Sequence, residues 1–155
     1  MKYIKILFLV LISLFFSCKE EHFYNQYVEI PNQIWNQSEV VKFQVDVKDI
    51  SAFYNISIAI NHNKKYEYGN LWLFAKVTSP NGKTKIDTID LILIKEDNNW
   101  DGKCNNRNCK AITTYVDSIK FVEPGIYTFE FEQGVRKANL PNISKIGLII
   151  DKLSK

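Results

Sequence analysis

Residues 71–94 read LWLFAKVTSPNGKTKIDTIDLILI, two apolar runs separated by a turn. The runs at 71–77 and 88–94 are rich in aromatic and β-branched residues, which favour strands. Between them lies SPNGK, residues 79–83, in which Asn-Gly supplies the positive φ angles of a tight hairpin. The segment therefore predicts two antiparallel strands, the second beginning after Lys83.

Strand-like patterns continue on both sides of this hairpin. In VVKFQVDV, residues 40–47, apolar and polar side chains alternate, as in a strand with one buried and one solvent-exposed face. Further strands are predicted at 56–60, 126–132 and 145–151, with weaker ones at 27–30 and 113–121. The longest helical feature that the pattern allows is a short turn near Val135 to Asn139.

The order of these elements predicts the fold class. About eight strands without helices between them indicate an all-β protein, an antiparallel β-sandwich over residues 27–155. Immunoglobulin-like and jelly-roll-like sandwiches both fit the pattern, and so does a small closed barrel. A chain of 155 residues is long enough for one domain with a sizeable core.

The chain begins with a pattern typical of secretory signals. Lys2 and Lys5 precede an apolar run of about eleven residues, which is too short for a bilayer-spanning helix of roughly twenty. Residues 1–17 are therefore predicted to be a lipoprotein signal peptide, and Cys18 the lipidated first residue of the mature chain. The alternative is a signal cleaved elsewhere, with Cys18 left as a free thiol. Residues 18–26 are mostly polar and aperiodic, which indicates a tether.

The charge balance argues against one class of partner. The net charge is +3, and removal of residues 1–17 takes away Lys2 and Lys5 and leaves a side-chain charge of +1. Such a balanced chain gives no sign of a nucleic-acid groove. No nucleic-acid partner is expected.

Cys104 and Cys109 lie in one short loop, DGKCNNRNCK. Export would place them in an oxidising compartment, which favours a disulfide. A metal site would need two more ligands, and the two histidines, His22 and His62, are distant in sequence. Two free thiols are the third alternative.

Residues 96–102, EDNNWDG, contain the candidate metal site. Asp97, Asn99 and Asp101 alternate before Gly102, as at the start of a calcium loop. The twelfth position from Asp97 is Asn108 rather than the glutamate that such a loop requires. A polar turn with Trp100 packed inward is therefore the preferred interpretation, and no cofactor, catalytic residue or small-molecule substrate is predicted.

Aromatic residues cluster in KYEYGNLWLF, residues 65–74. Trp72 and Phe74 share one face of a predicted strand, so both fit a core. Tyrosine and tryptophan also anchor interfaces when half exposed. We choose Tyr66, Tyr68 and Arg136 as the candidate partner surface.

Five blocks carry a family resemblance. They are YEYGNLWLF, SPNGKTKIDTIDLIL, NNWDGKC, GIYTFEFEQGVR and LPNISKIGLIIDK, in this order between Tyr66 and Lys152. Together with the lipoprotein-type start, they resemble the gliding-motility lipoprotein family GldH of the Bacteroidetes. The resemblance implies a membrane-anchored accessory protein needed for gliding and linked to type IX secretion, with no enzymatic activity.

These observations lead to one functional hypothesis and one main alternative. The chain is expected to be a non-enzymatic cell-envelope protein, held by lipid on Cys18, that acts as an interaction or scaffold module for gliding or secretion proteins. The alternative is a surface carbohydrate-binding lipoprotein, which would need at least two coplanar exposed aromatic side chains. The periplasmic side is favoured, although Lys19, Glu20 and Glu21 resemble the surface-export signal of some Bacteroidetes lipoproteins.

Overall fold

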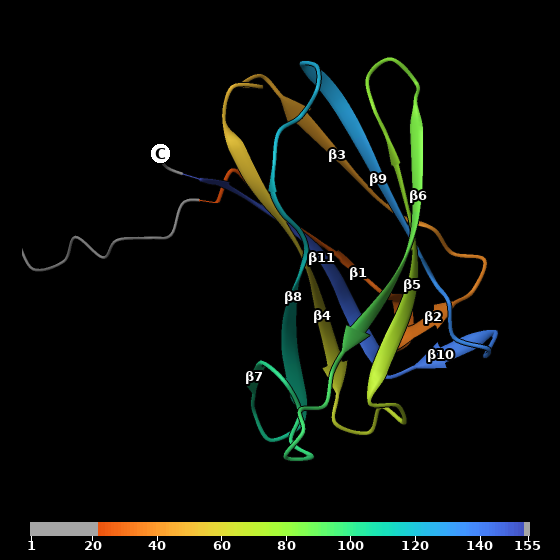
Figure 1. Ribbon diagram of the computed structural model, residues 1–155. Helices are drawn as coiled ribbons and strands as arrows, with labels where there is room; N and C mark the ends of the chain where they lie inside the picture. Colours follow the sequence, from red (N-terminus) through yellow and green to blue (C-terminus); the bar gives the residue numbers. More distant parts are fainter. Residues whose placement is uncertain (1–21, 154–155) are drawn as a thin grey trace, which may run out of the picture.

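The computed structural model describes residues 22–153, and these residues form a sandwich of β-strands (Figure 1). The signal peptide predicted at 1–17, Cys18, and the charged residues 19–21 lie outside the described residues. The elements are β1 (Tyr24–Glu29), the 3-10 turn η2 (Pro31–Gln33), β2 (Ile34–Asn36), β3 (Val41–Val47), β4 (Phe53–Asn63), β5 (Asn70–Thr78), β6 (Thr84–Ile92), β7 (Lys103–Cys104), β8 (Asn108–Ile119), β9 (Gly125–Gln133), β10 (Asn139–Pro141) and β11 (Ile143–Leu153).

The eight long strands are connected as a jelly roll. One sheet has the order β1-β11-β4-β8 with short β7 at its edge, and the other has the order β3-β9-β5-β6. Their pairing is nested, since the first long strand pairs with the last, the second with the seventh, the third with the sixth and the fourth with the fifth. The predicted all-β sandwich is confirmed, and of the topologies left open it is the jelly roll.

The hairpin predicted from residues 71–94 is formed by β5 and β6. The two strands pair antiparallel with Thr78 opposite Thr84. The turn between them is closed by hydrogen bonds from the Ser79 amide to the Lys83 carbonyl and from the Gly82 amide to the Ser79 carbonyl, each 2.9 Å long. The Asn-Gly signal therefore located this turn correctly.

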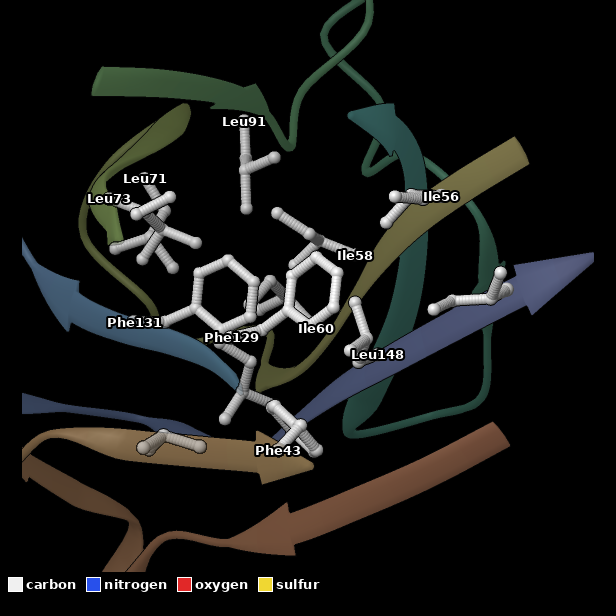
Figure 2. Close-up of a cluster of buried hydrophobic side chains, with 14 of the residues drawn as sticks. Phe43, Ile56, Ile58, Ile60, Leu71, Leu73, Leu91, Phe129, Phe131 and Leu148 are labelled. Carbon is white, nitrogen blue, oxygen red and sulfur yellow. The ribbon is translucent and has the colours of Figure 1, made fainter. Parts of the chain in front are cut away.

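The core fills the space between the two sheets (Figure 2). Strand β3 shows how alternation builds it, because Phe43 and Val45 are buried while Lys42 and Gln44 are exposed. Large side chains from both sheets are almost fully buried and include Ile58, Ile60, Leu71, Leu73, Leu91, Phe129, Phe131 and Leu148. Removal of this apolar surface from water is the main source of folding free energy.

Several boundaries differ from the predicted ones. Strand β1 begins at Tyr24, which pairs with Ile150, so the predicted tether at 18–26 extends too far into the domain. The short strands β2, β7 and β10 were not predicted, because segments of two or three residues carry no periodicity. Between residues 22 and 153 no helix has the length and apolar character needed to cross a membrane.

The sandwich has two ends with different contents (Figure 1). The N-terminal end consists of the loops at 48–52, 79–83 and 120–124 and the first described residues. The Asn81 amide donates to Glu123 Oε1 at 3.2 Å there, which joins two of these loops. The opposite end consists of the turns at 64–69, 94–102, 105–107 and 134–138.

Candidate functional site

A hollow of about 440 Å³ lies on the surface at the opposite end of the sandwich. Its lining residues come from the β4–β5 loop, the start of β5 and the loop after β9, and they are Tyr68, Asn70, Trp72, Gly134, Val135 and Arg136. We call this set the Trp72 hollow. It brings together Tyr68 and Arg136, two of the three residues chosen from the sequence as a partner surface.

Tyr66 does not belong to that surface. Its side chain is only 4% exposed, and its hydroxyl donates a hydrogen bond to the Asn70 carbonyl at 3.1 Å. Burial raises the pKa of the Tyr66 hydroxyl well above its usual range, with a smaller contribution from Tyr68. The Tyr66 ring packs edge-on against Tyr68, with centroids 5.6 Å apart. Tyr66 therefore packs beneath Tyr68 as a buried residue, and its choice as a surface residue was wrong.

The buried side chain of Gln133 holds the loop after β9, which forms one wall of the hollow. Its Nε2 donates to the Lys137 carbonyl at 2.8 Å, and its Oε1 accepts from the Val135 amide at 2.9 Å. These two bonds fold the chain around Arg136, whose side chain is exposed. Sequence reasoning missed Gln133, although it follows Tyr127, Phe129 and Phe131 at the inward-facing positions of one strand.

Two polar contacts connect the walls to their surroundings. Lys137 Nζ donates to Glu67 Oε2 at 2.9 Å and so links the two loops, and this contact raises the pKa of Lys137. Asn70 Nδ2 donates to Asp90 Oδ1 at 2.7 Å. The hollow combines the exposed aromatic side chains of Tyr68 and Trp72 with the exposed side chain of Arg136. Tyrosine, tryptophan and arginine are enriched in binding surfaces.

Trp72 and Phe74 lie on the outer face of the sheet, which corrects the expectation that they fill the core. Their side chains are 43% and 46% exposed, whereas Leu71, Leu73 and Ala75 on the other face of β5 are buried. Both faces of this strand are apolar in sequence, so alternation alone did not show which one the second sheet covers. The carbohydrate hypothesis requires at least two coplanar exposed aromatic side chains, and this face carries two exposed ones.

The other two tryptophans are not part of this surface. Trp35 is fully buried, and its Nε1 donates to the Glu39 carbonyl at 3.0 Å. Trp100 is half-buried against the core, and its ring centroid lies 4.6 Å from that of the buried His62. Burial lowers the pKa of His62.

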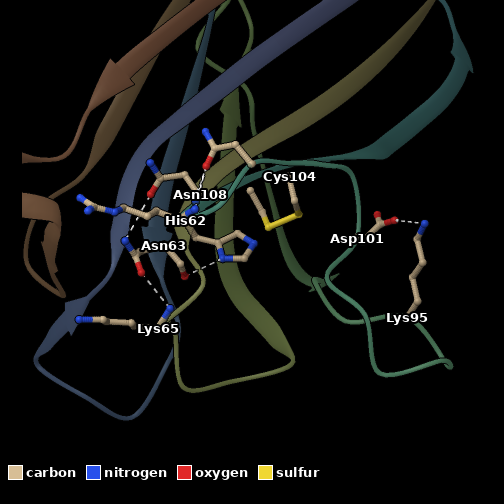
Figure 3. Close-up of a disulfide and its surroundings, with 10 residues drawn as sticks. His62, Asn63, Lys65, Lys95, Asp101, Cys104 and Asn108 are labelled. Carbon is tan, nitrogen blue, oxygen red and sulfur yellow. Dashed lines mark hydrogen bonds and ion pairs between the residues drawn. A yellow bond between two sulfur atoms is a disulfide. The ribbon is translucent and has the colours of Figure 1, made fainter.

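The residues weighed as a candidate calcium loop form a hairpin turn. The Lys95 amide donates to the Asn99 carbonyl at 2.8 Å, and the Asp97 carboxylate accepts from the Asn99 amide at 3.0 Å. The Asp101 carboxylate lies 3.4 Å from Lys95 Nζ, as Figure 3 shows. Gly102 has a φ of 83° and lies against the Lys110 backbone, where a Cβ has no room. The geometry is that of the polar turn preferred above.

Cys104 and Cys109 form a disulfide in the structure (Figure 3). They lie directly opposite each other in the pairing of β7 with β8. The loop between them is held by the Asn105 side chain, whose Oδ1 accepts from the amides of Arg107 and Asn108 at 2.9 and 2.8 Å. The disulfide therefore closes a short edge hairpin at the opposite end of the sandwich.

Within residues 22–153 no three His, Cys, Asp or Glu side chains are grouped as they would be to hold a metal ion. Near the hollow, Asp90 and Glu67 are each engaged by a neighbouring amide or ammonium group. The fold and the hollow thus define an all-β jelly-roll protein with exposed aromatic side chains around a surface hollow.

Comparison with known proteins leads from this class to a family. The model of the GldH lipoprotein family matches residues 22–150. The chain is 29% identical over 153 residues to the gliding motility lipoprotein GldH homolog of Christiangramia forsetii, covering 94% of this chain and 93% of that protein. It is 28% identical over 139 residues to the gliding motility lipoprotein GldH of Flavobacterium johnsoniae, covering 89% and 86%.

The chain belongs to the GldH lipoprotein family, as the resemblance predicted. Members of a lipoprotein family are anchored to a membrane of the cell envelope, and this coarse localisation agrees with the lipoprotein-type start. Both relatives are named as gliding motility lipoproteins, and neither name is that of an enzyme.

Proposed function

We propose that this protein is a non-enzymatic, lipid-anchored interaction module required for gliding motility and linked to type IX secretion. The observation that carries the proposal is the Trp72 hollow, in which half-exposed aromatic side chains and Arg136 line one concave surface. Tryptophan, tyrosine and arginine are the residues that most often dominate protein–protein binding energy. Membership of the GldH family supports the role in gliding, and the resemblance supports the connection with secretion.

The mechanism we propose is attachment followed by binding. Acyl chains on Cys18 hold the protein at the membrane, because two or more chains give the firm residence that a single chain does not. The domain then presents the hollow to another envelope protein of the gliding or secretion machinery. An aromatic or aliphatic side chain of the partner would stack on Trp72, and a carboxylate of the partner would pair with Arg136.

Capture of the partner from solubilised envelope tests the proposed surface. Tagged wild type is compared with Trp72→Ala combined with Arg136→Ala, and with Ile86→Ala as the control. Ile86 is an exposed apolar residue on the same outer face, 71% exposed and outside the hollow. We expect the double variant to lose the captured partner and to fail to restore gliding in a deletion strain. The Ile86→Ala control should capture the partner and restore gliding as wild type does. A double variant that captures and glides like wild type would rule out the hollow as the partner surface.

The role itself is tested by deletion. A strain without this protein that still glides and secretes normally would overturn the proposed function. For the anchor, Cys18→Ala should release the protein from membrane fractions, and continued membrane residence would count against lipidation. We propose that the domain faces the periplasm, so protease added to intact cells should leave it whole.

Carbohydrate binding is the second candidate, and one observation favours it. Trp72 and Phe74 lie two residues apart on the same exposed face of β5, the kind of aromatic platform on which sugar rings stack. Binding of the purified protein to a glycan array, lost in Trp72→Ala and Phe74→Ala, would support this function. Absence of any glycan binding, together with capture of a protein partner, would exclude it.

A further inference from the structure

The N-terminal end of the sandwich carries a group of exposed apolar side chains. Phe23, Ile50 and Phe53 are each close to 40% exposed, and Val122 is 80% exposed. Phe23 belongs to the first described residues, Ile50 and Val122 lie in loops, and Phe53 is the first residue of β4, all at this end of the sandwich. Apolar side chains at loop tips that are gathered at one end of a domain mark a contact with something less polar than water.

Phe23 packs on the buried Tyr54 ring, and the other three residues are sequence neighbours of Tyr54 or of residues that contact it. The Tyr54 ring lies 5.1 Å from that of Phe23 and 5.2 Å from that of Phe121, the residue before Val122. The Tyr54 hydroxyl donates to the Asp49 carbonyl at 2.7 Å, which fixes the loop that carries Ile50. Contacts of Tyr54 therefore connect the segments that carry these exposed residues.

Lysines border the same group. Lys120 Nζ lies over the Phe53 ring at 4.6 Å from its centroid, and Lys48 has a side chain that is 85% exposed. Lys152 pairs with Asp49 at 2.8 Å, and Lys48 lies 3.7 Å from Asp46. Apolar tips bordered by long cationic side chains are typical of surfaces that rest at a membrane interface.

The short segment between Cys18 and the folded domain also indicates that this end lies at the membrane. His22 Nδ1 lies 2.5 Å from Asp151 Oδ1, so the chain is already attached to the folded domain at His22. Cys18 precedes His22 by four residues, and a fully extended chain of this length spans only about 14 Å. A lipid on Cys18 would therefore keep this end of the sandwich close to the bilayer surface.

We infer that the end formed by Phe23, Ile50, Phe53 and Val122 rests on the lipid bilayer and sets the orientation of the domain. The inference rests on the lipid anchor at Cys18 that belongs to the proposed function. Phe23, Ile50, Phe53 and Val122 insert at the headgroup level, and the lysines meet anionic headgroups. The Trp72 hollow, which lies at the opposite end, then points away from the membrane toward a partner.

A site-specific fluorophore tests this orientation. Cys104 and Cys109 are bonded and Cys18 is acylated, so Val122→Cys supplies a unique reactive thiol in the full lipidated protein. The matched control is Glu96→Cys, in the exposed 94–102 turn at the opposite end and outside the loop that the disulfide closes. Each variant, labelled with nitrobenzoxadiazole, is reconstituted into vesicles of phosphatidylethanolamine and phosphatidylglycerol that contain a headgroup spin label.

We expect the probe at 122 to shift its emission to shorter wavelength and to be quenched by the spin-labelled lipid, and the probe at 96 to do neither. Ile50→Cys should behave as Val122→Cys does. A shift at 122 without lipid quenching would mean that protein covers this end, and equal quenching at 122 and 96 would mean that the domain has no preferred orientation. Either result overturns the inference.

Flotation of the vesicles separates this inference from the lipid anchor. Protein that floats with the vesicles while its probe at 122 stays unquenched would overturn the inference alone. Protein that does not float would refute the anchor and, with it, the orientation that depends on the anchor.

Discussion

Replacement of Gln133 by methionine tests whether a single buried amide shapes the candidate site. The side chain is fully buried and makes two hydrogen bonds to the loop that carries Arg136. Methionine has a similar length and fills the same space, so the change removes the bonds without opening a large cavity. Each backbone group left without a partner costs about 1–3 kcal/mol when buried. Val135 and Lys137 are only half-buried, so we expect a total loss of about 2 kcal/mol of folding free energy.

Guanidinium denaturation of the purified protein measures this loss, with Glu132→Met as the control. Glu132 is the exposed neighbour on the same strand, and its side chain points to solvent. We expect the midpoint to fall for Gln133→Met and to stay near wild type for the control, and amide exchange at 134–138 to accelerate only in the former. An unchanged midpoint, or an equal fall in both variants, would refute the assignment of Gln133 as the support of this loop.

Three further predictions concern other parts of the domain. Cys104→Ser combined with Cys109→Ser should lower the free energy of unfolding by about 2 kcal/mol, because the disulfide closes only a short loop. Denaturation measures this loss, and amide exchange should show that only the edge hairpin becomes more mobile. Burial lowers the pKa of His62 from its ordinary value of 6.5. As the pH drops below about 6.5, the unfolded chain therefore binds a proton at this residue before the folded chain does, and the free energy of unfolding falls. His62→Gln should flatten this part of the profile of stability against pH, and an unchanged slope would contradict the prediction. In Gly147→Ala the new Cβ would overlap the Tyr27 ring packed on it, so the melting temperature should fall, whereas wild-type stability would show that the ring moves aside freely.

Local signals in the sequence predicted the parts of this fold that depend on neighbouring residues. The alternation in β3 and the Asn-Gly turn between β5 and β6 were both confirmed, because strand faces and tight turns follow from side-chain direction and backbone freedom. Boundaries were less accurate, since β1 begins at Tyr24 inside the predicted tether. What holds this first strand is its pairing with β11, at the other end of the chain.

The candidate site was only partly predictable for a related reason. Of the residues chosen as a partner surface, Tyr68 and Arg136 line one hollow and Tyr66 is buried, while Trp72, expected in the core, is exposed. Composition shows that a residue is aromatic and suited to an interface, whereas exposure depends on which face of the sheet is covered. Gln133 carried a usable signal, because a polar residue at an inward position needs buried partners.

The sequence by itself determined the all-β class, the hairpin at its centre and membership of the GldH family. Only the tertiary structure decided that the strands nest as a jelly roll and that β5 turns Leu71 and Leu73 inward. The hollow exists for the same reason, since the β4–β5 loop and the loop after β9 meet only because β5 and β9 pair in one sheet. Such pairings join segments distant in the chain, and their energy comes from burial across the whole sandwich rather than from any local run of residues.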